Sequence, residues 1–497
     1  MNKHLKYGLS FVAGMAFLFL LLLMVAALAI NPNEYKPQIV RLVKEKKQRT
    51  LTLAGDIKLA FFPKLGLDLG RASISEFQGE KEFAAVESAR LYLSWWPLLK
   101  KKLVVDQVRI EGVRANLVRF RDGTTNFDDL LRNEEENKQL RFDIDSVMID
   151  GDALSFHDEM SGRQFALSDI RIRTGRLANG KPTEAAADFR LQSGNPRVDA
   201  LFHATTGLTF DTEARRYAVK GLSLEIRGTA AGLSRLAAGI KGDAALDRRA
   251  GTLLAENLAV AVTGKKGTDD IDVRLTAPRL RWAADKMSAD RIELVANVQQ
   301  GDGGEMGLVA SIPSLAGEGR AFSASLLNVD ISAKQPGGEY RGKLSSPLSG
   351  NFRDQQFALS ELKGTLAASG RKMPGRSIKL GIAGAAQLGL QPQSIKANLS
   401  LRLDESNIKL KAGISPFTKP HIAFDLDIDH IDADRYLPAR TSQSQLQPQK
   451  PFDFSLLKTF DASGSVRVGS LKLNNIKASN ARLDFKSGGG KLEVSEP

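Results

Sequence analysis

The sequence predicts a mainly β protein that follows one N-terminal membrane-spanning segment, and two observations support this. Residues 9–30 are almost wholly apolar and carry no charge. After them, short runs in which apolar and polar residues alternate recur almost to the end of the chain, separated by Gly, Asn and Asp. Alternation with a period of two is typical of strands that have one apolar face and one wet face.

The apolar segment is long enough to cross a bilayer. Its 22 residues (9–30) would make a helix of roughly 33 Å, close to the hydrocarbon thickness of about 30 Å. A cleaved signal peptide is the alternative, because Ala26–Ala29 offers small residues, but its apolar core should span only about 7–15 residues. We therefore predict an uncleaved signal anchor. Lys and Arg on both sides leave its orientation open, since long domains are translocated largely regardless of nearby charge.

A basic segment, Pro37–Arg49, follows the anchor. Ile39 and Leu42 alternate there with basic residues in a pattern that favours an amphipathic helix. Such a helix can lie on anionic headgroups, and it can equally cap the first strands; the two are compatible. The residues predicted to contact the membrane surface are Arg41, Lys44, Lys46 and Lys47.

The alternating runs supply candidates for the apolar face. In "LTLAGDIKLAF" these candidates are Leu51, Leu53, Ile57 and Leu59. In "IAFDLDIDHIDAD" they are Ile422, Phe424, Leu426 and Ile428, with Ala423 and the aspartates on the other face. Helical periodicity is rare; besides the basic segment it favours a short piece over Phe127–Arg132 and a further candidate over Ala231–Ile240.

Several architectures satisfy this pattern. A sandwich or a closed barrel packs the apolar face on itself, whereas a long open sheet that curls lengthwise leaves an apolar trough for acyl chains. Alternation alone does not separate these possibilities.

No catalytic pattern is present. The five histidines form no HExxH motif, and no GxSxG motif marks a nucleophile. Asp425–Asp434 has His430 where a calcium-binding EF-hand loop needs glycine. There is no cysteine, so disulfides and thiolate ligands are excluded. We expect no enzymatic activity, no metal and no cofactor. The net charge is +13, but the basic residues are spread along the chain, so we expect no nucleic-acid binding.

One loop, "RFRDGTTNFDDLL" (Arg119–Leu131), gathers acidic and amide side chains around a glycine. A cation site is one reading. The other is a turn at Asp122-Gly123 followed by a short helix that Asn126 caps, with Asp128 and Asp129 in its first turn and Leu130 packed on the sheet. The second reading is the prediction.

Several motifs in order resemble the AsmA family of Gram-negative envelope proteins. These are the N-terminal anchor, the strand from Gly55 to Pro63, "VVDQVRIEG" (Val104–Gly112), the "DGTTNFDDLL" ending, and "FDLDIDHIDADRYLP" (Phe424–Pro438). Ser463–Pro497 resembles the start of the family's C-terminal module. The middle of the chain matches only as generic strands.

The resemblance implies a long, curled antiparallel sheet that forms an apolar groove, with a few short helices. It implies an inner-membrane anchor, a β-rich body in the periplasm, and phospholipids as the ligand, carried toward the outer membrane; inner- and outer-membrane proteins are further expected partners. A scaffold for outer-membrane proteins that carries no lipid is the alternative. The expected organisation is a cytoplasmic tip and anchor (1–33), a membrane-proximal module (34–133), a groove body (134–440), a linker (441–451), and the start of a C-terminal module (452–497), which looks incomplete.

Overall fold

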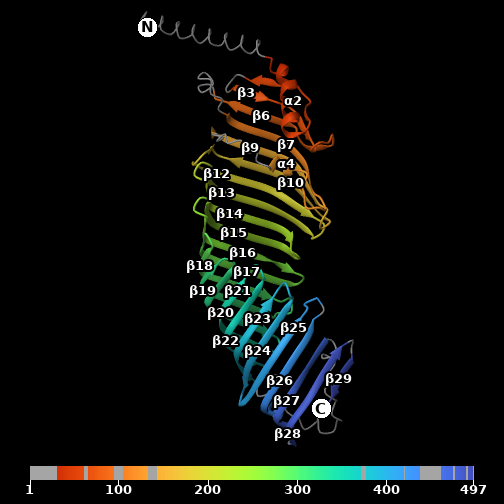
Figure 1. The fold of residues 1–497 in the computed structure, drawn as a ribbon, viewed down its shortest axis with the longest axis vertical. Helices are drawn as coiled ribbons and strands as arrows, with labels where there is room; N and C mark the ends of the chain where they lie inside the picture. The colour runs from red at the N-terminus through yellow and green to blue at the C-terminus, as the bar shows by residue number, and fades with distance from the viewer. Residues whose placement is uncertain are drawn as a thin grey trace, which may run out of the picture. The chain divides into compact units, whose positions relative to one another are not determined.

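The computed structural model describes residues 31–60, 65–94, 105–131, 143–370, 377–418, 420–436, 461–473, 476–488 and 491–495. The chain forms two compact units, Met1–Arg249 and Ala250–Pro497. Both are mainly β with few short helices, as predicted (Figure 1). The predicted anchor (9–30) and linker (441–451) lie outside the described residues. Within the described ranges, no helix has the length and hydropathy needed to cross a membrane.

The helical elements described in the N-terminal unit are short, and two of them precede its first strand. A 3-10 turn, η1 (Pro32–Tyr35), leads into α2 (Lys36–Lys47), which confirms the predicted basic helix. Gln48 has a left-handed backbone (φ 52°), and its N–H donates to the carbonyl of Lys44, which ends α2. A one-turn helix, α4 (Asp128–Leu131), stands where the sequence predicts a short helix.

The strands of the N-terminal unit follow. They are β1 (Leu51–Leu53), β2 (Lys58–Ala60), β3 (Leu65–Asp68), β4 (Ala72–Ser75), β5 (Glu82–Val86), β6 (Ser88–Leu93), β7 (Val105–Arg119), β8 (Asp143–Ile144), β9 (Ser146–Asp158), β10 (Arg163–Thr174), β11 (Leu177–Ala178), β12 (Pro182–Ser193), β13 (Val198–Asp211), β14 (Arg216–Ala230) and β15 (Leu233–Asp247).

The C-terminal unit has the same character. Its elements are β16 (Thr252–Lys266), β17 (Asp269–Ala283), β18 (Lys286–Gln299), β19 (Glu305–Glu318), β20 (Ala321–Gln335), β21 (Gly338–Asn351), β22 (Gln356–Ser369), β23 (Ser377–Gly389), β24 (Ser394–Leu403), β25 (Ser406–Ser415), β26 (His421–Asp432), the 3-10 turn η3 (Ala433–Tyr436), β27 (Asp461–Leu473), β28 (Ile476–Gly488) and β29 (Lys491–Ser495).

Most strands pair antiparallel with the next strand in the chain, but two pairs are parallel. β7 runs parallel to β9, and β26 runs parallel to β27. The antiparallel pairing that the resemblance implies is therefore wrong at these two steps. Each parallel step spans one of the polar stretches at residues 134–138 and 441–451, because parallel neighbours need a crossover of a dozen or more residues.

Two further expectations are corrected. The run Leu51–Phe61 is not one strand: β1 pairs with β4, β2 pairs with β3, and the chain turns between them. The helix considered over Ala231–Ile240 is absent; this stretch turns at Gly232 (φ +77°) and enters β15. Pairing along most of β14 holds it extended, so tertiary pairing overrides the weak helical period.

At some positions the alternation of apolar and polar residues changes phase by one residue, and β-bulges there keep the apolar side chains on one face. β7 bulges at Gly112 (φ +65°), and β10 bulges at Asp169 (φ +53°), where the register of the ladder shifts. One extra residue restores the side-chain phase, which a strand with strict period two would lose.

Few side chains are fully buried. In the C-terminal unit a cluster of Ala289, Leu315, Phe322 and Ala324 is at most 9% exposed, and partly buried apolar side chains of β17–β22 surround it. All these residues lie on strands of one sheet. The core is thus the apolar face of the sheet itself, not an interior between two layers.

Gly464 provides a test of this packing. A Cβ atom there would lie 2.1 Å from the carbonyl oxygen of Phe424 and 2.7 Å from its ring, whereas a Cβ on Gly413 would have its nearest atom at 3.8 Å. We expect Gly464→Ala to destabilise the C-terminal unit by about 2 kcal/mol. Gly413→Ala is the control and should melt like the wild type. Thermal unfolding followed by circular dichroism measures both; equal midpoints for the two variants would contradict the β26–β27 contact.

Candidate functional site: the apolar face of each unit

Residues directly opposite one another on neighbouring strands point to the same side of a sheet, so the register shows which side chains share a face. In the N-terminal unit one row of partners crosses seven strands and is entirely apolar. From β7 to β15 it consists of Ile110, Ile149, Ile172, Ala187, Ala204, Leu224 and Ile240. We call this side of the sheet the apolar face and the opposite side the outer face.

Three of the four lining residues predicted near the N-terminus lie on this apolar face. Leu59 is in one row with Leu67, Leu91 and Val108, the last of these two residues before Ile110. Leu51 and Leu53 join the same face through their partners on β4. Ile57 lies between the strands, where it is 4% exposed and the Asn33 side chain bonds both its N–H and its carbonyl.

In the C-terminal unit the rows are equally apolar. Ile428, for example, lies beside Ile408 and Leu401 on one side and Val468 on the other. All four residues predicted on β26, Ile422, Phe424, Leu426 and Ile428, lie on this face and are half-buried or buried, and the residues that alternate with them are exposed. The predicted alternation is therefore confirmed along this strand.

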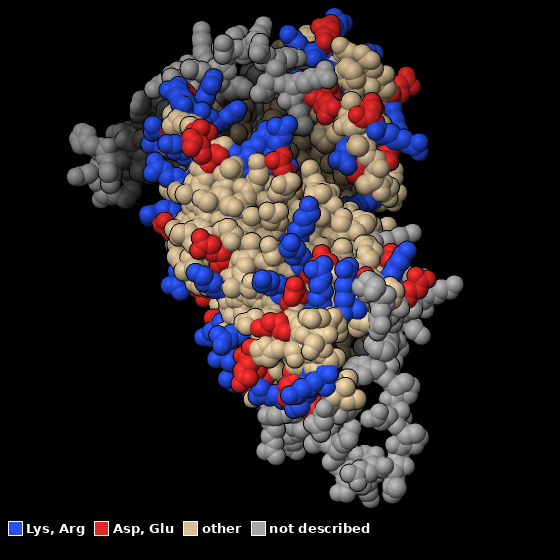
Figure 2. Space-filling model, turned by 60° about the horizontal axis from the view of Figure 1, so that its bottom comes forward, with Lys and Arg blue, Asp and Glu red and all other residues tan. Residues whose placement is uncertain are grey.

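No second layer covers either face among the described elements, whose contacts are mainly with their hydrogen-bonded neighbours. Large apolar side chains consequently reach water: Met306 is 45%, Ile331 39%, Leu366 38% and Ile395 38% exposed. Figure 2 shows the charged side chains in separate groups with uncharged surface between them. Exposed apolar area of this extent marks a binding surface.

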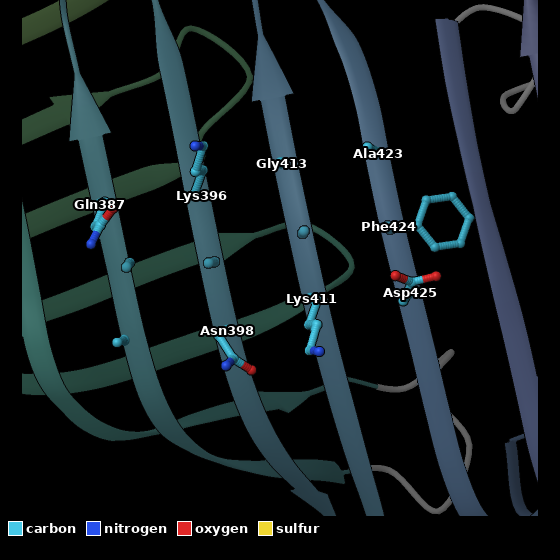
Figure 3. Close-up of a pocket in the computed structure, with 12 residues that line it drawn as sticks. Gln387, Lys396, Asn398, Lys411, Gly413, Ala423, Phe424 and Asp425 are labelled. Atoms are coloured by element: carbon cyan, nitrogen blue, oxygen red, sulfur yellow. The ribbon is translucent and has the colours of Figure 1, made fainter.

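The apolar face is the less exposed face of β26 in the C-terminal unit. Phe424 is half-buried although it is large, whereas the smaller Ala423 on the outer face is exposed. Because no described element covers this face, the shielding comes from neighbouring side chains of the same face, such as Phe485, whose ring centre is 6.4 Å from that of Phe424. The strand ribbons of β23–β26 are visibly curved (Figure 3).

The membrane-proximal helix α2 has two different sides. Val40 and Val43 are half-buried, whereas Ile39 is 37% and Leu42 57% exposed. Of the residues predicted to contact a membrane, Arg41, Lys44 and Lys46 are exposed and Lys47 is partly exposed. A helix that is basic and also exposes apolar side chains suits the headgroup region of an anionic membrane.

The loop Arg119–Leu131 has a structural role, because two of its residues bond to the buried Arg49. Arg49, 1% exposed, donates from Nη2 to Oδ1 of Asp129 (2.6 Å) and lies 4.5 Å from the centre of the Phe83 ring. It also donates to the carbonyls of Ser75 (2.8 Å) and Asn126 (2.6 Å). This one side chain therefore joins the end of α2 to β4, β5 and α4.

Two details of the predicted loop are wrong. Asn126 is buried and does not cap α4; it accepts from the N–H of Val118 and donates to the carbonyl of Asn116. Asp128, the first residue of α4, accepts from the N–H of Thr125 (2.9 Å) and so closes the turn that leads into the helix. Leu130 is 41% exposed and is not packed on the sheet. The turn at Gly123 (φ +88°) is confirmed.

The described carboxylates with strongly shifted pKa values have local structural partners. Hydrogen bonds from Ser161 and Arg119 lower the pKa of Asp158 to about 2. Hydrogen bonds from Asn407 lower the pKa of Asp429 to about 2. Within the described ranges, no group of three or more His, Asp or Glu side chains is arranged to hold a metal ion.

The family model of the AsmA family matches residues 1–300. The chain belongs to the AsmA family. Among curated proteins it is similar to Protein AsmA of Escherichia coli (strain K12), with 27% identity over 169 residues. That stretch is 33% of this chain and 26% of the relative, so the chain spans about a quarter of the length of that protein. No solved structure matches the chain.

In this AsmA-family chain the buried role of Arg49 has no local signal in the sequence. Arg49 ends a run that includes Lys44, Lys46 and Lys47, all of which are at least half-exposed. Only pairing of β1 with β4, together with the loop that carries Asp129, encloses it. The acidic residues of the loop were visible as a cluster, but their partner was not.

The buried pair predicts a pH dependence. Hydrogen bonds from Arg49 lower the pKa of Asp129 in the folded protein. The stability that the Asp129–Arg49 pair gives to the fold is therefore fully present above the unfolded pKa of about 3.9, and it is lost as the pH falls through the lower folded pKa. We expect Asp129→Asn to cost about 3 kcal/mol at pH 7, because Arg49 remains buried without its charge partner. The difference from wild type should shrink toward pH 3, measured by urea unfolding.

Asp122→Asn is the matched control in the same loop, since Asp122 is exposed and accepts only from Thr124. It should lose much less stability than Asp129→Asn. A loss in Asp129→Asn no larger than in this control would show that the pair with Arg49 does not hold the module together.

Proposed function

We propose that this chain holds or conducts phospholipid along its apolar face, moving it from the inner toward the outer membrane and so supporting outer-membrane biogenesis and lipid balance. The observation that carries the proposal is an apolar sheet face that no described element covers. Family membership supports a role in lipid transport or outer-membrane biogenesis in coarse terms only.

The mechanism is passive and needs no catalytic residue. Acyl chains lie against apolar rows such as Leu59–Leu67–Leu91 and Leu410–Leu426, and each methylene removed from water contributes about 0.8 kcal/mol. The headgroup stays in water beyond the rim of the sheet. Since neighbouring rows offer nearly the same contact, a lipid can shift from one row to the next without leaving the apolar surface.

The proposal includes the placement of the chain. Residues 9–30 anchor it in the inner membrane, the β-rich body lies in the periplasm, and α2 rests on the headgroups through Leu42 and its basic neighbours. Inner- and outer-membrane proteins are the further partners. The chain acts by binding, without enzymatic turnover.

Adjacent residues on opposite faces test the lipid proposal. Ile331 is on the apolar face and 39% exposed, and Ser332 is exposed on the outer face. We expect Ile331→Asp to reduce co-purified phospholipid severalfold, because a carboxylate would enter the acyl contact. Ser332→Asp should retain it. Native mass spectrometry of protein in mild detergent, with melting curves as the folding control, measures this.

If the wild-type protein purifies without lipid, or if both variants lose lipid equally, the apolar face is not the lipid site and a scaffold role replaces it. Because both side chains are exposed, neither substitution opens a cavity in a packed interior.

The absence of cysteine allows a clean test of α2. Leu42→Cys, labelled with an environment-sensitive fluorophore in anionic nanodiscs, should shift to the blue and be quenched by brominated lipid. Lys58→Cys, exposed on β2, is the control and should stay unquenched. Equal quenching at both positions, or none at either, would contradict a membrane-resting helix.

A further inference from the structure

The outer face of the C-terminal unit carries a second surface that the lipid proposal leaves unused. Five exposed cations lie on it in adjacent strands β21–β24, and we call them the basic face: Lys343, Lys363, Lys379, Lys396 and Arg402. The register places them on one side of the sheet, because Lys343 lies in one row with Thr365, Gly381 and Arg402. Lys363 lies in the next row, beside Ala383.

Positive charge exceeds negative charge in strands β21–β24, whereas the two nearly balance in strands β16–β19. Strands β21–β24 contain six Lys or Arg against two Glu, and Glu339 already pairs with Arg341 at 3.3 Å. The five cations have no carboxylate partner within the described part of the chain. Strands β16–β19 contain seven Lys or Arg against eight Asp or Glu, and several of these are ion pairs, such as Arg274–Asp272 at 2.7 Å.

Small residues form the floor between these cations. The outer face of β23 presents Gly381, Ala383 and Ala385 in succession. Lys396 and Asn398 lie on the same face of the next strand, β24, opposite Gln387 and Ala385 of β23 (Figure 3). A ligand main chain can therefore approach the sheet closely while its side groups reach the cations.

The types of side chain on the basic face indicate which class of ligand it can bind. Tyr340 and Phe357, the aromatic residues of β21–β24, lie in rows of the apolar face, so this outer face has no platform on which a nucleic-acid base could stack. Cations fit carboxylates, and hydroxyl and amide groups such as those of Thr365, Asn398 and Ser400 fit a peptide main chain. Same-face positions along a strand repeat every 6.6–7 Å or so, as do alternate side chains of an extended peptide.

We propose that the basic face docks an extended acidic peptide segment of a partner protein. Carboxylates at alternate positions of that segment pair with the unpaired cations, while its main chain lies over the glycine and alanine floor of β23. The surface is on the opposite side of the sheet from the apolar face, so docking and lipid binding do not compete for the same side chains.

The test uses the full chain in detergent and a fluorescent twelve-residue peptide with Glu at alternate positions. We expect binding in 50 mM salt that weakens as salt rises, because exposed pairs are screened. The triple variant Lys363→Gln, Lys396→Gln, Arg402→Gln should bind about tenfold more weakly, because three exposed charge pairs are lost. Fluorescence anisotropy measures this.

The matched control neutralises three exposed, ion-paired cations, Arg274→Gln, Arg279→Gln and Arg291→Gln, and should bind within about twofold of wild type. Equal weakening in both triples would overturn the proposal, as would a peptide with Gln in place of Glu that binds equally well. Stronger binding of polygalacturonate or of anionic vesicles to the basic face would assign it to another ligand class. None of these outcomes alters the phospholipid content of the protein, so the two proposals fail separately.

Discussion

An apolar sheet face costs free energy wherever it meets water, and in the described part of this chain no layer of helices or strands covers that face. In the C-terminal unit, neighbouring rows of the apolar face partly bury one another. Around Leu315 and Phe322 the side chains are almost fully buried. At Met306 and Leu366 apolar surface remains exposed to water. The stability of the sheet and the proposed lipid binding thus depend on side chains of the same face.

That constraint explains which strand faces and pairings could be predicted from the sequence and which could not. β26 alternates strictly, so its apolar face could be assigned residue by residue, from Ile422 to Ile428. The bulges at Gly112 and Asp169 break the alternation in β7 and β10, so the period alone fails there. The side of the sheet to which Leu59 belongs depends on its pairing with Leu67, a contact that no local pattern encodes. The two parallel steps were missed for the same reason.

The first strands of the N-terminal unit are very short, so few ladder hydrogen bonds hold them in the sheet. β1 has three residues and cannot hold a sheet edge by its own ladder. Side chains replace that ladder: Asn33 bonds both backbone groups of Ile57, and Arg49 joins β4, β5 and α4. The acidic loop that looked most like a cation site instead supplies Asp129 as the counter-charge for Arg49. Its carboxylate is already engaged, so the same residue cannot also act as an open ligand.

The two faces of the C-terminal sheet combine small residues with different partners: large apolar side chains on the apolar face and cations on the outer face. On the apolar face, large residues lie beside glycine, as Phe424 beside Gly464, so that the ring packs over the glycine backbone. On the outer face of β23, glycine and alanine lie between cations, which keeps the charges apart and their floor accessible. Period-two alternation lets one strand obey both rules at once, because outside the bulges neighbouring residues point to opposite faces. The proposed lipid site on one face and the proposed peptide site on the other therefore use different side chains of the same strands.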